Sequence, residues 1–203
     1  MTTKYIAIDG YDCSGKSTVI HALTEYYAGK KILVERLLPL SVGIFLEYGN
    51  GHDYYKNIPY EFRVVSYLWE TYIRLNLLAE KYSQYDYVFF DRWLFTSYVN
   101  EKKLDFGPYK DLIAFIKAKV TKPDYLFLIQ SDPETILKRL KRKNDWMLHY
   151  KNENEIISES TQFYKGYVEQ LTIYDVPYRV VENNTSIETC INNIIDTLHE
   201  EFD

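Results

Sequence analysis

The sequence predicts an α/β fold in which five parallel strands form one sheet, covered by helices on both faces. Short apolar runs rich in β-branched and aromatic residues alternate along the chain with longer segments of helical periodicity. This alternation is typical of a parallel sheet with helices on both faces. A chain of 203 residues is long enough to bury a full core, and no linker interrupts it, so we expect a single domain over residues 1–203.

The strands are expected where apolar runs too short for helices are bounded by polar or turn residues. These runs cover residues 5–9, 31–35, 87–91, 125–130 and 178–182. Helical periodicity covers residues 17–28, 60–83, 109–120, 133–143, 156–171 and 187–202. Pro59 and Pro133 mark two of the helix starts, and Gly29 marks the end of the first helix.

Two segments interrupt this regularity, residues 39–58 and residues 144–154. In a sheet of this kind, the loops at the carboxyl ends of the strands form the binding site. We therefore expect both segments to be moving parts of the site, and the second, at about residues 144–154, to act as a lid.

Residues 10–17 follow the pattern Gly, four residues, Gly-Lys-Ser/Thr, which is typical of a phosphate-binding loop. The loop lies between an expected strand and an expected helix, as the pattern requires; an ordinary strand-to-helix turn is the competing interpretation. Glycines let successive N–H groups point at a polyphosphate at the positive end of the helix. Lys16 would reach the β- and γ-phosphates, and the Ser17 hydroxyl would bind Mg²⁺. The residues expected to bind ATP are Gly10, Ser14, Gly15, Lys16, Ser17 and Thr18.

A second chemical feature, Asp91-Arg92-Trp93, ends the most apolar of the expected strands. Asp91 would hold Mg²⁺ directly or through water, and the planar guanidinium of Arg92 would bind a second anion bidentately. A salt bridge at the strand end is the competing interpretation. A carboxylate such as Asp12 inside the loop is electrostatically unfavourable beside a polyphosphate. Its presence therefore suggests that it serves the phosphate acceptor and not ATP; a solvent-facing loop acid is the competing interpretation.

Composition narrows the class of protein. The formal net charge of −5, from 24 basic and 29 acidic residues, does not favour a nucleic acid or an anionic membrane as partner. The two cysteines, Cys13 and Cys190, do not look like a disulfide pair, and no run approaches a membrane span or a secretory leader. We therefore expect a cytoplasmic protein that acts on small molecules.

These motifs together resemble the thymidylate kinase family, a group of P-loop nucleoside monophosphate kinases. The run from Ile8 to Thr18 resembles the family's phosphate loop, and Asp91-Arg92-Trp93 followed by Thr96 resembles its Asp-Arg-Tyr/His motif. Further similarity lies in Asp132-Pro133-Glu134 with Arg139 before the lid, in Phe163-Tyr164 with Tyr167 after it, and in Pro39, which fits a proline that shapes the thymine pocket.

The resemblance implies a three-layer α/β/α sandwich and transfer of the ATP γ-phosphoryl group to the 5′-phosphate of dTMP, with Mg²⁺ as cofactor. It also implies that Asp12 meets the acceptor sugar, that Arg92 binds the acceptor phosphate, that Asp91 organises Mg²⁺ and that Arg139 contacts ATP. The substrate-binding set implied is Asp12, Pro39, Tyr67, Thr71, Arg74, Arg92, Thr96 and Asn100. Related kinases pair through helices, so a homodimer is the oligomeric state that the resemblance suggests.

Three departures from the family pattern bear on the substrate. The catalytic arginine of the loop or lid is missing, because Cys13 and Trp146 occupy those places. We expect Arg142, Lys143 or Lys151 to supply the charge, and we assign Arg142 as catalytic with Asp12, Lys16 and Arg92. Thr71 replaces an arginine near the base, and Asn100 replaces an aromatic against the deoxyribose, so discrimination should be loose.

Other functions are compatible with parts of the pattern. A kinase acting on a broader set of deoxynucleotides, or on unphosphorylated deoxynucleosides, would use the same loop, although deoxynucleoside kinases typically have Glu-Arg-Ser where this chain has Asp-Arg-Trp. A nucleotide-binding switch module would carry an Asn-Lys-x-Asp motif, which residues 122–124 do not match.

Overall fold

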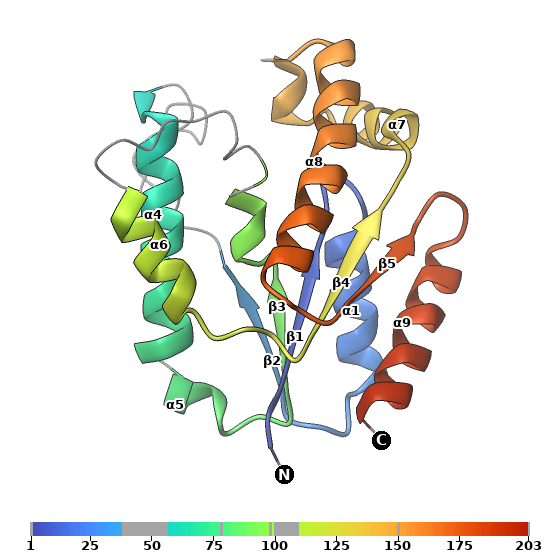
Figure 1. The fold of residues 1–203 in the computed structure, drawn as a ribbon. Helices are drawn as coiled ribbons and strands as arrows, with labels where there is room; N and C mark the ends of the chain where they lie inside the picture. The colour runs from blue at the N-terminus through green and yellow to red at the C-terminus, as the bar shows by residue number, and fades with distance from the viewer. Residues whose placement is uncertain are drawn as a thin grey trace.

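The computed structural model describes residues 2–37, 57–77, 79–97, 99, 110–149 and 151–202. Within these ranges, five parallel strands form one sheet in the order β2-β3-β1-β4-β5. The strands are β1 (Lys4–Asp9), β2 (Ile32–Arg36), β3 (Tyr87–Asp91), β4 (Tyr125–Gln130) and β5 (Tyr178–Glu182). The strand order and the helices on both faces confirm the predicted α/β sandwich (Figure 1).

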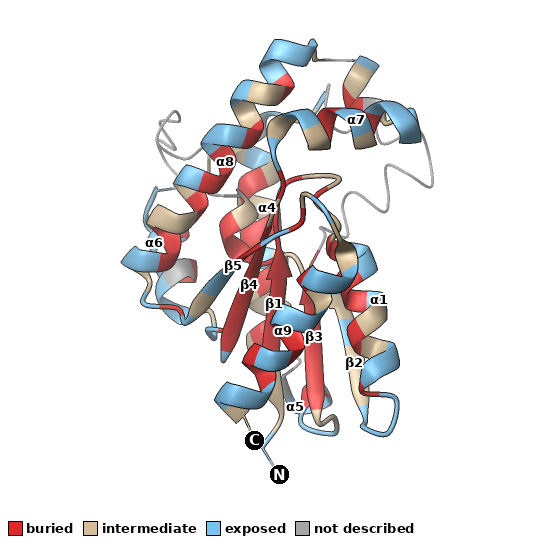
Figure 2. Ribbon diagram, turned by 90° about the vertical axis from the view of Figure 1, so that its right-hand side faces the viewer, coloured by how far each residue is buried: buried red, intermediate tan, exposed pale blue. Residues whose placement is uncertain are grey.

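Alternate residues of the central strands form two cores, one on each face of the sheet. Ile6 and Ile8 pack with α1 (Lys16–Tyr26) and α9 (Ile187–Phe202). Ala7 lies on the opposite face, with α4 (Tyr60–Tyr72), α6 (Lys110–Lys119), α7 (Pro133–Lys143) and α8 (Glu153–Ile173). Figure 2 shows that β1, β3 and β4 are buried almost throughout, as expected for strands covered on both sides.

The strand predictions match the structure to within one residue at every end. The helix predicted over residues 60–83 is instead divided into α4, a π-helical turn (Ile73–Leu77) and α5 (Ala79–Tyr82). The Asn76 side chain donates to the Tyr72 main-chain oxygen at 3.0 Å. This is the carbonyl that the Asn76 N–H would use in an α-helix, and such competition favours a local π turn.

The segment predicted as a lid, residues 144–154, has more regular structure than expected. Asn144 ends α7 in a left-handed conformation, and a 3₁₀ helix (Trp146–His149) follows. Helix α8 begins at Glu153, three residues before the predicted start, because Asn152 and Glu155 form a reciprocal capping box.

The carboxyl ends of β1 and β3 meet at one edge of the sheet. Ile8 pairs with Asp91, so the chain segments that leave the two strands start side by side. The segment after β1 leads into α1, and the segment after β3 leads into a 3₁₀ helix (η2, Leu94–Ser97). Within the described ranges, no helix is both long enough and apolar enough to cross a membrane.

Candidate active site

The loop of residues 10–15 requires its two glycines. Gly10 has a φ of 152° and Gly15 a φ of 109°, both in the region that side chains disfavour. A Cβ on Gly10 would lie 2.3 Å from the Ile129 main-chain oxygen, and one on Gly15 would lie 2.3 Å from Asn183 Nδ2. The loop therefore fits tightly between β4 and the chain after β5.

The first turn of α1 offers free amides. Gly15 is the N-cap residue and makes no side-chain cap hydrogen bond. Among the described residues, none accepts a hydrogen bond from the main-chain N–H groups of Lys16, Ser17 and Thr18. Ser17 and Thr18 are exposed. These free donors at a helix N-terminus fit a polyphosphate.

Lys16 is buried and folded back over the loop. Its Nζ donates to the main-chain oxygens of Gly10 at 2.8 Å and Tyr11 at 2.9 Å. Burial and the nearby Arg92 guanidinium together lower the pKa of Lys16 to about 8, against the opposing effect of Asp12. An anionic ligand at the loop would favour the charged amine, so this lysine also fits a polyphosphate.

The underside of the loop is held by buried polar groups from β4, α7 and the end of β5. The Ser14 main-chain oxygen accepts hydrogen bonds from Asn183 Nδ2 at 2.7 Å and Arg139 Nη1 at 3.2 Å. Arg139 also donates to the main-chain oxygens of Cys13 at 3.2 Å and Asn183 at 2.8 Å, and to Ser131 Oγ at 3.0 Å. The guanidinium of Arg139 thus supports the loop backbone, and its predicted contact with ATP stays a prediction.

Asp9, which has no exposed surface, joins the phosphate loop to the segment after β3 and to α8. Its Oδ1 accepts from Gly10 N at 2.7 Å. Its Oδ2 accepts from Trp93 N at 2.8 Å, Thr96 Oγ1 at 2.5 Å and Tyr167 OH at 2.5 Å. The Thr96 hydroxyl, which we predicted to bind substrate, is therefore directed at Asp9 in this structure.

Arg92 and Asp12 face each other across the mouth of the site. Arg92 adopts a left-handed conformation with φ of 74°, and its N–H donates to the Ile8 main-chain oxygen at 3.0 Å. Its Nη2 donates to Asp12 Oδ1. Burial opposes ionisation of both groups, but the attraction between the two charges outweighs this effect. The pKa of Asp12 is therefore lowered and that of Arg92 is raised. Asp12 and Arg92, the two residues predicted to bind the acceptor substrate, thus contact each other, and both are charged.

Asp91 and Ser17 are the residues predicted to hold Mg²⁺. Asp91 lies at the end of β3, with Arg36 Nε 3.6 Å from its Oδ2, and it is close enough to influence the Lys16 pKa. Ser17 is exposed in the first turn of α1. Hydroxyl and carboxylate oxygens suit this cation, and the described residues contain no group of three or more His, Cys, Asp or Glu side chains that could bind a metal.

On the α4 side of the site, the side chains that we predicted to bind substrate are hydrogen-bonded to other residues of the protein or buried. Tyr67 OH donates to the Trp93 main-chain oxygen at 3.0 Å, and Thr71 is 2% exposed. Arg74 Nη1 donates to Glu35 Oε1 at 3.2 Å and to the Arg36 main-chain oxygen at 2.5 Å. The Arg74 guanidinium therefore fastens α4 and its π turn to β2 in this structure. Pro39 and Asn100 lie outside the described residues.

The cations of α7 differ in where they lie. Arg142 is exposed, and its side chain makes no hydrogen bond or ion pair with another residue in the described part of the chain. Lys143 lies closer to the loop: burial raises the pKa of the Cys13 thiol, and the charge of Lys143 partly offsets that rise. Lys143 is thus near enough to Cys13 to act on its thiol, and the catalytic role of Arg142 stays a prediction.

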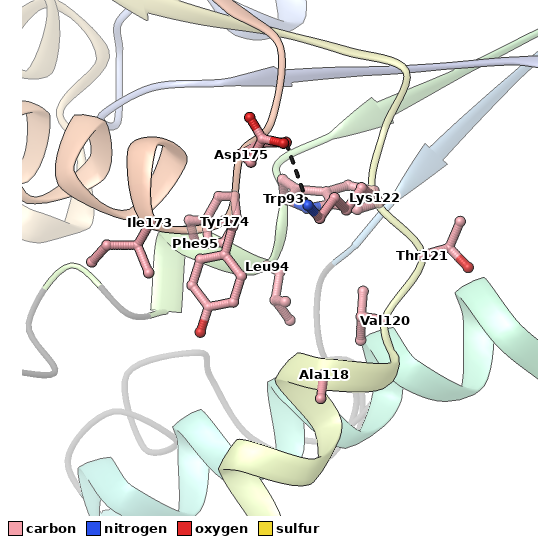
Figure 3. A pocket seen from close by; sticks show the side chains of 10 residues that line it. All are labelled: Trp93, Leu94, Phe95, Ala118, Val120, Thr121, Lys122, Ile173, Tyr174 and Asp175. Carbon is pink, nitrogen blue, oxygen red and sulfur yellow. Dashed lines mark hydrogen bonds between the residues drawn. The ribbon is translucent and has the colours of Figure 1, made fainter.

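A separate cavity of about 260 Å³ is lined in part by the segment Trp93–Phe95 (Figure 3). The rings of Trp93, Phe95 and Tyr174 line it, and Lys122 Nζ donates to the Asp175 main-chain oxygen at 3.4 Å on its wall. No residue of the phosphate loop lines this cavity. It is therefore not the nucleotide site.

Several residues that organise the site were not among our predicted site residues: Asp9, Tyr11, Ser131, Glu159, Tyr167 and Asn183. Asp9 and Asn183 end or follow strands at the carboxyl edge of the sheet, where sites form in this architecture. That position is a signal that could have identified both.

A parallel sheet with this loop after its central strand defines a P-loop protein. Residues 64–194 match the family model described as "Thymidylate kinase", so the chain belongs to the thymidylate kinase family and is a kinase phosphotransferase. No curated protein matches the sequence significantly.

Solved structures with the same fold carry two different names. A thymidylate kinase from Ehrlichia chaffeensis is 15% identical, with a TM-score of 0.64 over 98% of this chain and 100% of that chain. A deoxyadenosine kinase from M. mycoides with dCMP and dCDP bound is 22% identical, with a TM-score of 0.67 over 96% of this chain and 98% of that chain. The same enzyme with bound dCTP gives a TM-score of 0.64 at the same identity and coverage. At these identities the similarity shows the fold alone.

Proposed function

We propose that the protein transfers the γ-phosphoryl group of ATP to the 5′-phosphate of dTMP, giving dTDP and ADP. Family membership supports a nucleotide kinase. The free amides at the start of α1 and the buried Lys16 support a polyphosphate donor at the loop.

The observation that carries the choice of a monophosphate acceptor is the Arg92–Asp12 pair. The Arg92 guanidinium is 15% exposed and contacts Asp12 of the phosphate loop. A phosphate on the acceptor could take the place of the Asp12 carboxylate on Arg92, and the planar fork suits it bidentately. Asp12 would then be free to meet the acceptor sugar. An unphosphorylated nucleoside would offer Arg92 no anion other than Asp12.

A nucleoside kinase would also need a base for the 5′-hydroxyl proton, whereas a phosphate oxygen is already ionised. Two carboxylates near the ends of the described strands are engaged: Asp12 by Arg92, and Glu35 by Arg74 at 3.2 Å. This favours the monophosphate acceptor over the deoxynucleoside alternative.

On the donor side, the loop amides, Lys16 and Arg92 would neutralise the charge of the transferring group, because such a reaction needs little beyond in-line positioning and charge neutralisation. Ser17 and Asp91 would hold Mg²⁺, which when bound bridges phosphate oxygens and reduces their charge. Gly10, Ser14, Gly15 and Thr18 would complete the ATP site.

On the acceptor side, Tyr67, Thr71, Thr96 and the neighbouring Arg74 would line the pocket together with Pro39 and Asn100. Tyr67 and Thr96 lie close to Asp9 and Trp93, which supports a place beside Arg92. Loose discrimination is expected, since Thr71 offers a smaller contact than an arginine.

The remaining parts of the proposal concern the whole chain. Residues 1–203 would form one cytoplasmic domain with a lid at about residues 144–154. A homodimer would be formed through α4 and α6, where Phe62, Trp69, Leu112 and Phe115 are exposed large hydrophobic residues. Size-exclusion chromatography with light scattering would test this pairing.

A panel of acceptors tests the activity. In an ADP-release assay with Mg²⁺ and ATP, we expect the highest kcat/KM with dTMP, a lower value with dUMP and measurable transfer to other pyrimidine monophosphates. A purine monophosphate as best acceptor would overturn the thymidylate assignment. An unphosphorylated deoxynucleoside as best acceptor would also overturn the role proposed for Arg92.

A further inference from the structure

Three cations from three parts of the chain surround Asp12. Arg92 contacts it directly, Lys16 lies beside it in the loop, and Lys151 comes from the segment before α8. All three lower the pKa of Asp12 against the opposing effect of burial. The region where donor and acceptor would meet therefore has a cation, Lys151, on the α8 side as well.

A single carboxylate oxygen links Lys151 to the phosphate loop. Glu159 Oε2, on the second turn of α8, accepts from Lys151 Nζ at 2.5 Å and from Tyr11 OH at 3.2 Å. Tyr11 follows Gly10 in the loop, and its ring packs edge-on against Phe163, with centroids 5.6 Å apart. Glu159 thus fixes the distance between Lys151 and the loop.

The main chain at Lys151 is also fixed. Its N–H donates to the Met147 main-chain oxygen at 3.0 Å. The next residue, Asn152, accepts from Glu155 N at 3.0 Å, and its own N–H donates to Glu155 Oε2 at 2.8 Å. Lys151 is therefore held from both sides at the start of α8.

We propose that Lys151 is a catalytic residue that donates to the transferring phosphoryl group, and that Glu159 is the positioning residue that holds it over the loop. This inference rests on the proposed function. In the step, the bond from the γ-phosphorus to the bridging oxygen breaks and its electron pair stays on ADP. An ionised oxygen of the acceptor phosphate forms the new bond to phosphorus, so no proton needs to move.

The chemistry of lysine allows both contacts at once. An ammonium has three donors, so Lys151 can keep its bond to Glu159 and still donate to a phosphoryl oxygen. Lys141 provides the contrast, because it pairs with Glu153 at 2.6 Å between α7 and α8, and Glu153 makes no hydrogen bond to the phosphate loop within the described residues. Arg142 is exposed and reaches no described residue.

The first experiment compares Lys151→Met with Lys141→Met, the matched variant of the neighbouring ion pair. With the best monophosphate acceptor, we expect Lys151→Met to lower kcat on the order of a hundredfold, the usual effect of losing one transition-state donor. The kcat of Lys141→Met should stay within about twofold of the wild-type value. The kcat of Lys151→Arg should be about tenfold higher than that of Lys151→Met, because the charge is restored. A loss of less than about threefold in Lys151→Met overturns the proposal, as does a hundredfold loss in Arg142→Ala with none in Lys151→Met.

The second experiment tests whether Glu159 acts through Lys151. Glu159→Gln should lower kcat about tenfold in the wild-type background and less than about twofold in Lys151→Met, since residues that act together are non-additive. Equal effects in both backgrounds would overturn the positioning role. Both ion-pair partners are partly exposed, at 32% and 42%, so neither change should alter stability much.

A binding measurement separates this proposal from the proposed function. Calorimetric titration needs no acceptor, so it remains informative even if dTMP is not the substrate. Lys151→Met should weaken binding of the ATP analogue AMP-PNP about tenfold and leave ADP binding unchanged, because only the analogue carries a γ-phosphoryl group. Equal losses for both nucleotides, or no loss for either, would overturn a contact with that group. No turnover of wild-type protein with any monophosphate would contradict the proposed function instead.

Discussion

The underside of the phosphate loop and the segment over its mouth are held by different kinds of contact. The underside rests on buried Asp9, Asn183 and Ser131, together with Arg139. The segment between α7 and α8 is held by ion pairs between partly exposed side chains, Lys141–Glu153 and Lys151–Glu159.

This difference sets how easily each region can rearrange. Leaving a buried polar group without its partner costs about 1–3 kcal/mol, whereas an exposed ion pair contributes about 0–1 kcal/mol. The loop is therefore preorganised for phosphate before any ligand binds. The ion pairs above it cost less to break than the buried contacts beneath it, so this segment can rearrange more easily than the loop.

The largest expected effect comes from breaking the underside. Asp9→Asn replaces one of the two acceptor oxygens by an NH2 group, which would face either Gly10 N on the Oδ1 side or the three donors on the Oδ2 side. We expect the free energy of unfolding, measured in urea, to fall by about 3 kcal/mol. KM should rise for both ATP and acceptor, because Gly10 begins the phosphate loop and Trp93 ends the Asp91-Arg92-Trp93 motif.

The matched control is Asp86→Asn at the opposite edge of the sheet. Asp86 Oδ2 accepts from Lys31 N at 2.8 Å in an exposed setting. We expect this variant to lose less than about 1 kcal/mol. Equal losses in the two variants would show that burial of Asp9 is not what fixes the loop.

A smaller effect is expected at the mouth. Arg92→Lys keeps the charge but loses the bidentate fork, so KM for the acceptor should rise about tenfold while ATP binding changes little. Steady-state kinetics with each substrate varied in turn will measure both. A weakened ATP affinity with unchanged acceptor KM would place Arg92 on the donor side.

The smallest effect concerns pH. In the free protein Lys16 has a pKa of about 8, below its ordinary value of 10.5, so the charged form is lost as the pH rises through 8. We expect kcat/KM for ATP to fall about fourfold between its plateau and pH 8.5, since this quantity reports the free enzyme. Bound polyphosphate raises the lysine pKa, so kcat should fall only at higher pH.

Lys16→Arg is the control for this pH profile, because arginine stays charged throughout the range. Its activity should be lower, but its kcat/KM should show no decline near pH 8. A decline that persists in Lys16→Arg would assign the titration to another group. The lowered pKa of Lys16 also affects stability. Between about pH 8 and 10.5 the unfolded state binds more protons than the folded state, so the free energy of unfolding rises with pH in this range.

The sequence was sufficient for the sheet and the loop, because both depend on local patterns. Five apolar runs located the strands, and the glycine spacing located the phosphate loop. The partners of individual polar side chains could not be predicted. Arg74 pairs with Glu35, 39 residues away, and Tyr167 reaches Asp9 across 158 residues, so both contacts depend on how distant elements pack.

The hydrogen bonds of Asp9 also determine when the site can be completed during synthesis. Its partners Trp93, Thr96 and Tyr167 follow it by 84, 87 and 158 residues. Strand β1 precedes the other four strands in the chain, yet it lies in the middle of the sheet and needs β3 and β4 beside it. The loop after β1 therefore leaves the ribosome before the segments that hold it, so a nascent chain that ends before α8 lacks part of the contacts that fix this loop.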